Sequence, residues 1–195
     1  MNGAMYLVRH TSVAVGPTMC YGRSDVALAE SWREEFEDVV SKLSLEQLDG
    51  ARIYSSPLTR CALLAEHLAN QGLRSPEHDA RLQEMNFGRW ELNPWSELPA
   101  TEISTWRRNV VDSPAPGGES FGEVASRASA FFEDARTALD RHGCIVICHG
   151  GVIRALLAHV IGCTLEQALK LQVDYGGITR LELGTTQHRI AYVNR

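Results

Sequence analysis

Two short apolar segments, each ending in a histidine, constrain the fold of this 195-residue chain most strongly. Residues 4–10 are AMYLVRH, and residues 144–149 are CIVICH. Short, continuous apolar runs are typical of strands buried on both faces, as in parallel sheets covered by helices. Ligands of such sheets bind beyond the carboxyl ends of the strands. We therefore expect His10 and His149 to lie at one edge of a sheet that faces a ligand.

The rest of the chain alternates between helix-like and strand-like patterns. Ser56 and Pro57 resemble a helix start, with serine as N-cap, and Gly72 is suited to end that helix. Ser120 and Glu123 match the S-x-x-E capping box of another helix. We expect helices at about 28–44, 57–71, 121–141 and 152–161, strands at 51–56 and 76–82, loops and helical pieces at 86–118, and a hairpin at 177–193.

This order of elements predicts an α/β fold. Strands that alternate with helices form a mainly parallel central sheet with helices on both faces, a three-layer sandwich, and the final hairpin adds an antiparallel edge strand. The length suits a single domain over residues 1–195, since no linker or repeat divides the chain.

Charge and composition exclude several functional classes. The net charge of −5, without any long run of lysine or arginine, gives no basis for nucleic-acid binding. No apolar run approaches the roughly 18 residues that a membrane span requires, and the N-terminus lacks the pattern of a secretion signal. The five cysteines form no C-x-x-C motif and suit a reducing compartment. We expect a cytoplasmic monomer or homodimer.

Several polar residues at expected strand ends and helix starts predict a phosphate site: Arg9, His10, Arg60, Glu84 and His149. The planar guanidinium of arginine binds phosphate oxygens bidentately. Gly150 and Gly151 open the helix after His149, and the free N–H groups at a helix start attract anions. The expected partner is therefore a small phosphorylated metabolite, with Gly150 among the residues that bind it.

The same residues favour catalysis without a metal or other cofactor. Nothing acidic enough to hold Mg²⁺ accompanies them, so catalysis would depend on fixed positive charge and a side-chain nucleophile. Neighbouring arginines lower the pKa of an imidazole, which keeps it neutral and nucleophilic near pH 7. Glu84 could protonate the leaving alkoxide and then deprotonate the attacking water. The alternative, a zinc site of His10, His149 and Glu84, is disfavoured because the arginines repel a divalent cation.

Four segments resemble, in order, the successive motifs of the histidine phosphatase superfamily, in its phosphoglycerate-mutase-like branch (branch 1): LVRHT, YSSPLTRC, QEMNFGRWE and ICHGGVIRALL. Their order and spacing fit almost the whole chain. The resemblance implies an α/β sandwich and a phosphohistidine formed at His10. It also implies that Arg9, Arg60 and His149 hold the phosphoryl group and that Glu84 is the proton donor.

Two further segments, CYGRSDVALAE and PGGESF, resemble the α-ribazole-5′-phosphate phosphatases of cobalamin nucleotide-loop synthesis. This resemblance implies that Tyr21 and Gly22 line the substrate pocket. Thr11 stands where phosphoglycerate mutases usually have glycine, and the chain is shorter than those enzymes, which favours a phosphatase. Arg23 stands where we expect glutamine in the α-ribazole group, so the exact substrate stays open.

The segment STWRRN resembles the paired arginines with which mutases bind a substrate carboxylate. Arg107 and Arg108 either contact the non-reacting end of the substrate or lie on a solvated helix face. Trp90 and Trp95 either pack in the interior or stack on an aromatic substrate. The alternatives to an α-ribazole phosphatase are a phosphoglycerate mutase, a broad-specificity sugar or nucleotide phosphatase, and a phosphoryl-binding module without activity.

Overall fold

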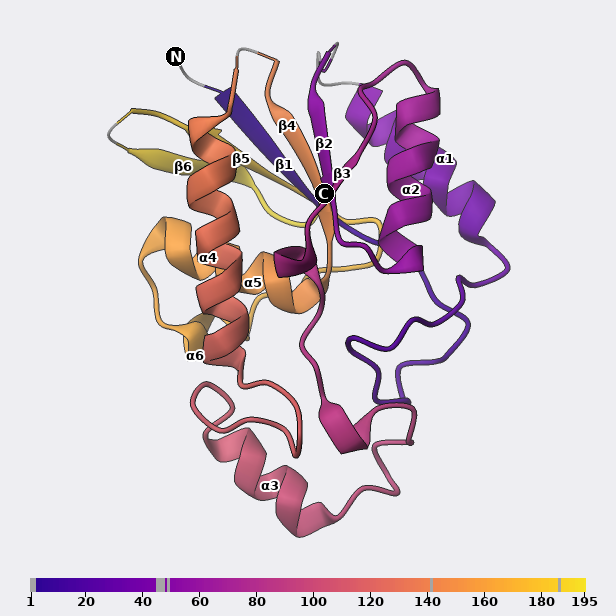
Figure 1. Cartoon of the computed structure of the whole chain (residues 1–195), viewed down its shortest axis with the longest axis vertical. Coiled ribbons are helices and arrows are strands. Elements are labelled where there is room, and N and C mark those ends of the chain that lie inside the picture. Colours follow the sequence, from indigo (N-terminus) through magenta and orange to yellow (C-terminus); the bar gives the residue numbers. More distant parts are fainter. Residues whose placement is uncertain (1–2, 45–47, 49, 141, 186) are drawn as a thin grey trace.

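The structure, a computed structural model, describes residues 3–44, 48, 50–140, 142–185 and 187–195. Within these residues a six-stranded sheet has the order β3-β2-β4-β1-β5-β6 (Figure 1). The strands are β1 (Gly3–Arg9), β2 (Arg52–Ser55), β3 (Glu77–His78), β4 (Cys144–Cys148), β5 (Ile178–Leu183) and β6 (His188–Tyr192). The first four pair in parallel, whereas β5 is antiparallel to both β1 and β6. The expected mainly parallel sheet with an antiparallel edge is confirmed.

Helices cover both faces of the sheet because β1 is apolar on both sides. Met5 and Leu7 point into one hydrophobic core, and Tyr6 and Val8 point into the other, as the alternation of strand side chains requires. The helices of the first core are α4 (Phe121–Thr137), α5 (Gly150–Ile161) and α6 (Leu165–Ala168), and those of the second are α1 (Trp32–Ser44) and α2 (Thr59–Asn70).

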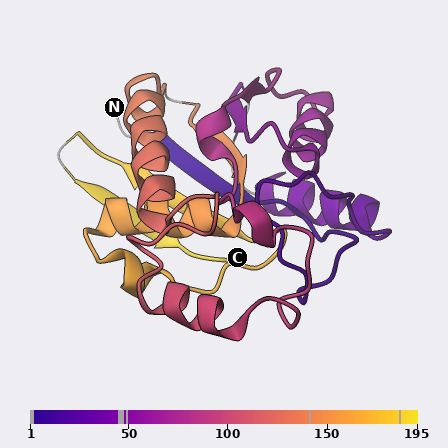
Figure 2. The same cartoon turned by 60° about the horizontal axis from the view of Figure 1, so that its bottom comes forward.

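A smaller lobe lies beyond the carboxyl ends of the parallel strands (Figures 1 and 2). It contains α3 (Ala100–Arg108) and a 3-10 turn (Gly88–Trp90). Cys20, from the loop after β1, packs in this lobe with Trp90 and Ile103. The lobe is therefore attached to the edge of the sheet where the sequence predicts a ligand.

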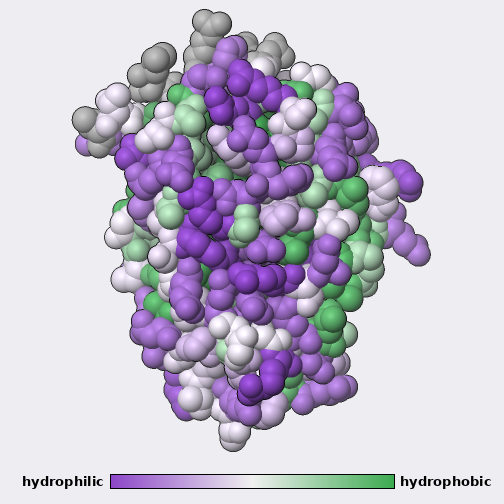
Figure 3. All heavy atoms as spheres, viewed as in Figure 1, coloured by the Kyte–Doolittle hydropathy of each residue, from purple (hydrophilic) through white to green (hydrophobic). Residues whose placement is uncertain are grey.

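The face seen in Figure 3 is largely hydrophilic, and its apolar patches are small and separated from one another. No helix in the described part of the chain has the length and apolar content needed to span a bilayer.

The helix after β2 begins at Thr59 rather than at Pro57. Ser56 does not cap it, because its backbone N–H donates to the carbonyl of Ile147 (2.9 Å) and so extends the pairing of β2 with β4. Leu58 takes the N-cap position instead, without a side-chain hydrogen bond. Strand pairing thus moves the helix start past Ser56, whose hydroxyl oxygen accepts the N–H of Leu58 (3.4 Å).

Other element boundaries also differ from expectation. The strand expected at 76–82 contains only two residues, because the Asp79 carboxylate accepts the N–H of Arg81 (2.8 Å) and starts a short 3-10 turn there. The capping box of Ser120 and Glu123 is present at the start of α4 as predicted. That helix ends at Thr137, a few residues earlier than expected.

Candidate active site

The two strand-end histidines meet at the carboxyl edge of the sheet. His10 follows β1 directly, and His149 is the only residue between β4 and α5. Because β1 and β4 are parallel neighbours with Arg9 opposite Cys148, the two imidazole rings come together, 5.0 Å apart between centroids. Both histidines are buried, at 2% and 0% exposure. The parallel register therefore builds the centre of the site.

The His10 ring is held in one tautomer. Its Nδ1 lies 2.7 Å from the carbonyl oxygen of Thr11, and a carbonyl can only accept, so Nδ1 carries the proton. Burial lowers the pKa of His10 well below its usual value, and the charges of Arg60 and Arg9 lower it further. The ring is therefore neutral, with a lone pair on Nε2.

The His149 ring is fixed from the side of α2. Its Nε2 lies 2.9 Å from the Ser56 hydroxyl oxygen and 3.5 Å from the Cys61 sulfur. Burial lowers the pKa of His149 well below its usual value, and the neighbouring His10 and Arg60 add to this effect. Burial raises the pKa of the Cys61 thiol, which keeps it protonated. Sequence reasoning missed Ser56 and Cys61 as partners of the histidine.

Arg9 and Arg60 are anchored through part of each guanidinium only. Arg60 is fully buried and donates to the carbonyls of Ser24 (2.9 Å) and Gly22 (2.5 Å). Arg9 donates to the carbonyl of Val173 (2.6 Å). The Nε atoms of both arginines are buried and have no partner among the described residues. Unpaired buried N–H groups are rare in proteins, so these two are available for an anion.

Glu84 lies at the start of α5. Its carboxylate accepts the N–H of Gly151 (3.0 Å) and that of Met85 (3.0 Å). A Cβ atom on Gly151 would lie 2.3 Å from the Glu84 carboxylate, so glycine is required for this approach. The second glycine of the ICHGG motif therefore positions the carboxylate at the start of α5, two residues after His149.

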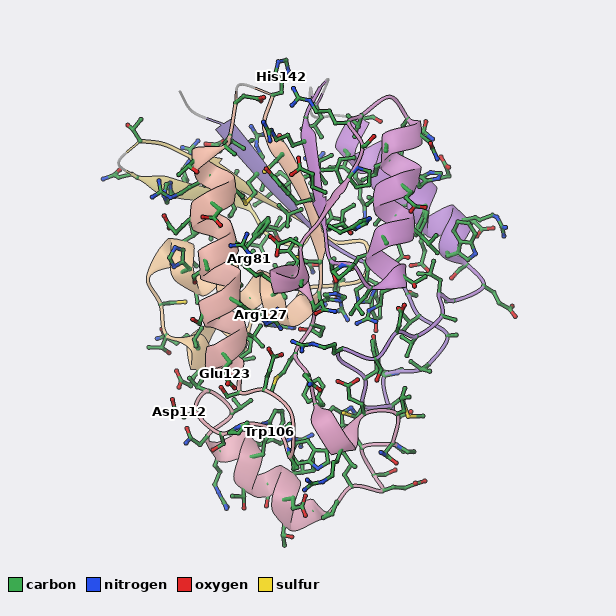
Figure 4. All side chains as sticks on the ribbon, in the orientation of Figure 1. Arg81, Trp106, Asp112, Glu123, Arg127 and His142 are labelled. Atoms are coloured by element: carbon green, nitrogen blue, oxygen red, sulfur yellow. The ribbon has the colours of Figure 1, made fainter. Side chains whose placement is uncertain are left out.

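An arginine on α4 supports the chain segment that carries Glu84 (Figure 4). Arg127 donates to the carbonyls of Arg81 (2.7 Å), Gln83 (2.5 Å) and Glu84 (3.1 Å). Glu119 pairs with the other side of the same guanidinium at 3.1 Å. Arg127 lies outside the strand-end pattern, so sequence reasoning assigned it no role in the site.

A close backbone approach fixes the loop that binds Arg60. A Cβ atom on Gly22 would lie 1.9 Å from the carbonyl oxygen of Met85, so only glycine fits there. Glu91 accepts the backbone N–H groups of Arg23 (2.9 Å) and Ser24 (2.6 Å). The loop after β1 is thereby tied to the segment that follows Glu84, which keeps the carbonyl partners of Arg60 in place.

Gly150, the first residue of α5, leaves room for two arginines. A Cβ atom there would lie 3.0 Å from Nη1 of Arg154 and 3.6 Å from Nε of Arg9. Arg154 points back toward the start of its own helix, as helical side chains do, and its Nε donates to the Leu171 carbonyl (2.8 Å). Sequence reasoning missed Arg154, although its position four residues after Gly150 places both on one helix face.

The expected site residues fall into two groups. A connected group contains Arg9, His10, Tyr21, Gly22, Arg60, Glu84, His149 and Gly150. Arg107 and Arg108 are exposed in the last turn of α3, and the contacts described for them reach none of this group. Trp90 is buried at 3% exposure against Trp106, so it is a packing residue. Trp95 packs edge-on against a neighbouring phenylalanine.

Buried arginines with unpaired N–H groups beside neutral histidines are features of enzymes that act on phosphate esters. Residues 5–195 match the model of the histidine phosphatase superfamily (branch 1), and the chain belongs to this family. The expected enzyme class, a phosphoric monoester hydrolase, is thereby confirmed.

Relatives of known name differ in substrate. Phosphoserine phosphatase 1 of Hydrogenobacter thermophilus is 26% identical over 194 residues, which cover 97% of this chain and 91% of the relative. A 2,3-bisphosphoglycerate-dependent phosphoglycerate mutase of Brucella canis is 27% identical, with 90% of each chain covered. The structure of the α-ribazole phosphatase from Shigella flexneri matches with a TM-score of 0.85 at 22% identity, over 98% of this chain and 96% of that one. At 22% identity, the match to the Shigella structure shows that the two chains share a fold, and it shows nothing about the substrate.

Proposed function

We propose that this protein is a metal-independent phosphomonoesterase that works through a phosphohistidine at His10. The observation that carries the proposal is the pair of buried, unpartnered Nε–H groups on Arg9 and Arg60 beside a neutral imidazole with a free Nε2. Donors that are fixed before the substrate arrives stabilise the charge of the transition state without reorganisation. Arg9, Arg60 and His149 would hold the phosphoryl oxygens, together with the N–H of Gly150.

The reaction has two steps. In the first, Nε2 of His10 attacks phosphorus, the ester P–O bond breaks, and the Glu84 carboxyl gives its proton to the leaving oxygen. In the second, the Glu84 carboxylate takes a proton from water, whose oxygen attacks phosphorus. The P–N bond then breaks and its electron pair returns to Nε2, which releases inorganic phosphate and restores the enzyme.

The substrate that we propose is α-ribazole-5′-phosphate. The segments CYGRSDVALAE and PGGESF support it, and Tyr21 and Gly22 of the first segment lie against Arg60 in the site. The protein would then be a cytoplasmic monomer or homodimer whose partner is this metabolite.

A second candidate is a phosphoglycerate mutase. The Brucella relative favours it, and Arg107 and Arg108 would then bind the substrate carboxylate. Incubation with 3-phosphoglycerate distinguishes the two activities, because a mutase isomerises the substrate and a phosphatase releases inorganic phosphate. A broad-specificity phosphatase would instead show similar kcat/KM values for α-ribazole-5′-phosphate, phosphoserine, sugar phosphates and phosphotyrosine.

The nucleophile is tested by trapping. Rapid denaturation of wild-type protein during turnover of a radiolabelled phosphate ester should leave acid-labile label on the protein. His10→Ala should carry no label and lose about 10⁴-fold or more in kcat/KM, since removal of a nucleophile has effects of this size. His78→Ala, on the exposed strand β3, is the matched control and should behave as wild type. Full activity of His10→Ala, or loss of wild-type activity in EDTA, would contradict the proposal.

A further inference from the structure

Two tyrosines from distant parts of the chain meet beside His10. Tyr175 precedes β5, and since β5 is antiparallel to β1, this loop lies next to the end of β1. The Arg9 N–H donates to the Gly177 carbonyl (3.1 Å), and the Gly176 N–H donates to the Arg9 carbonyl (3.2 Å), which fixes the loop there. Tyr21 comes from the loop after β1, and its hydroxyl oxygen lies 2.6 Å from that of Tyr175.

Each tyrosine also lies against one of the two arginines of the site. The Tyr175 ring centroid is 3.8 Å from Cζ of Arg9, and the Tyr21 centroid is 5.4 Å from Cζ of Arg60. The ring of His10 is 5.5 Å from the ring of Tyr175. The phenol bridge therefore spans the distance from one arginine to the other, next to the attacking imidazole.

The bridge leaves one O–H group free. A phenol has a single proton, so one tyrosine donates in the bridge and the other keeps its own proton for a third group. Burial and the hydrogen bond to Tyr175 raise the pKa of Tyr21 far above its usual range, so Tyr21 stays protonated. The 2.6 Å contact allows either hydroxyl to donate, and a bridge donated by Tyr21 leaves the proton of Tyr175, the ring beside His10, for a third group. Among the described residues, Tyr175 has no hydrogen-bond partner at its hydroxyl besides Tyr21.

We propose that Tyr175 is a phosphoryl-binding residue, which donates its O–H to a non-bridging phosphoryl oxygen while it accepts a hydrogen bond from Tyr21. The bridge joins two rings that lie against Arg9 and Arg60, each of which leaves a buried Nε–H unpaired. A phosphoryl group in contact with those two donors brings a third oxygen within reach of the bridge. The inference rests on the proposed function, because it assigns a further ligand to the same phosphoryl group.

The test removes single hydroxyl groups. Tyr175→Phe keeps the ring on Arg9, so we expect the Kd for inorganic phosphate, measured by calorimetry, to rise about tenfold, with a similar loss in kcat/KM. Tyr21→Phe leaves the Tyr175 proton in place and should change both values by only about threefold. The double variant should equal Tyr175→Phe, because Tyr21 acts only through its partner. Tyr192→Phe, on β6, is the control and should match the wild type.

Three results would overturn this inference. One is a phosphate Kd in Tyr175→Phe that is within about twofold of the wild type, or lower. Another is a lower melting temperature with an unchanged Kd, which would make the bridge a structural link between two loops. The third is a double variant in which the two losses multiply. If no phosphohistidine is trapped but Tyr175→Phe still weakens phosphate binding, the proposed reaction fails and the binding role of Tyr175 stands.

Discussion

The protonation of His10 determines which of its nitrogen atoms can react. The Thr11 carbonyl holds the proton on Nδ1, so the lone pair is on Nε2. Burial, followed by the charges of Arg60 and Arg9, lowers the pKa of the ring, so the neutral form persists on acidification. In the proposed reaction, a histidine placed in this way would need no separate general base, because its ring is already unprotonated at neutral pH.

This state of His10 predicts an unusual pH dependence. Attack requires the neutral ring, and a lowered pKa keeps the ring neutral below 6.5, the ordinary value for histidine. The single-turnover rate of phosphoenzyme formation should therefore not decline as the pH falls through about 6.5. Rapid-quench measurements over the range from about pH 5 to 8 would check this.

The control for this prediction is Arg9→Met. Loss of one nearby positive charge raises the pKa of His10, so the acidic decline of the rate should move to higher pH than in the wild type. A wild-type rate that falls with a midpoint near 6.5 would contradict the prediction.

The first residues of helix α5 bring several side chains of the site together. It starts immediately after His149, and its first two residues, Gly150 and Gly151, admit side chains that a Cβ atom would displace. Arg9 and Arg154 approach the first glycine, and Glu84 approaches the second. Side chains from β1, from α5 itself and from the segment before the 3-10 turn at Gly88–Trp90 thus meet at the start of α5, directly after His149.

Gly151→Ala should impair catalysis without unfolding the protein. The new Cβ would collide with the Glu84 carboxylate, while alanine is the better residue inside a helix by about 0.5–1 kcal/mol. We expect kcat to fall about 100-fold, since a displacement of about 1 Å can have this effect. Steady-state kinetics and thermal melting would measure both quantities.

Glu84→Gln is the reference for this variant. Both changes should reduce turnover of alkyl phosphates far more than turnover of p-nitrophenyl phosphate, whose leaving group needs no proton. Gly16→Ala, where only the Thr18 side chain lies within 4.0 Å of the added atom, should have no effect. An unchanged kcat in Gly151→Ala would show that Glu84 does not need this position.

Considered as a whole molecule, the protein holds its site between the sheet and the smaller lobe. Glu119 forms ion pairs with Arg127 on α4 (3.1 Å) and with Arg23 in the loop after β1 (2.9 Å). It also accepts the backbone N–H of Asn86 (2.9 Å). The position of Glu84 therefore depends on contacts among three separate parts of the chain.

Arg127→Met should lower both stability and activity. It leaves the carbonyls of Arg81, Gln83 and Glu84 without their donor, and each unsatisfied buried group costs about 1–3 kcal/mol. We expect the free energy of unfolding to fall by about 2 kcal/mol or more, as measured by urea denaturation, together with a lower kcat.

The matched control is Arg136→Met, which removes an exposed pair with Glu133 on the same helix. Its stability should change by less than about 1 kcal/mol. Equal losses in the two variants would contradict the bridging role of Arg127.

The sheet and the meeting of the two histidines could be predicted from sequence, because continuous apolar runs define buried strands and parallel strands end at one edge. The residues that contact those histidines, Ser56, Cys61 and Tyr175, could not. Tyr175 reaches His10 only because β5 is antiparallel to β1, and no local pattern marks its loop. The Ser56 prediction was wrong for a related reason, since pairing with β4 outweighed its capping preference.

Arg60 has a consequence for the unliganded protein. It is among the largest fully buried side chains, and no carboxylate among the described residues forms an ion pair with it or with Arg9. A buried charge without a counter-charge is costly, and an anion that binds only the folded state returns that free energy as stability. Inorganic phosphate that binds at these arginines should therefore raise the melting temperature of the protein.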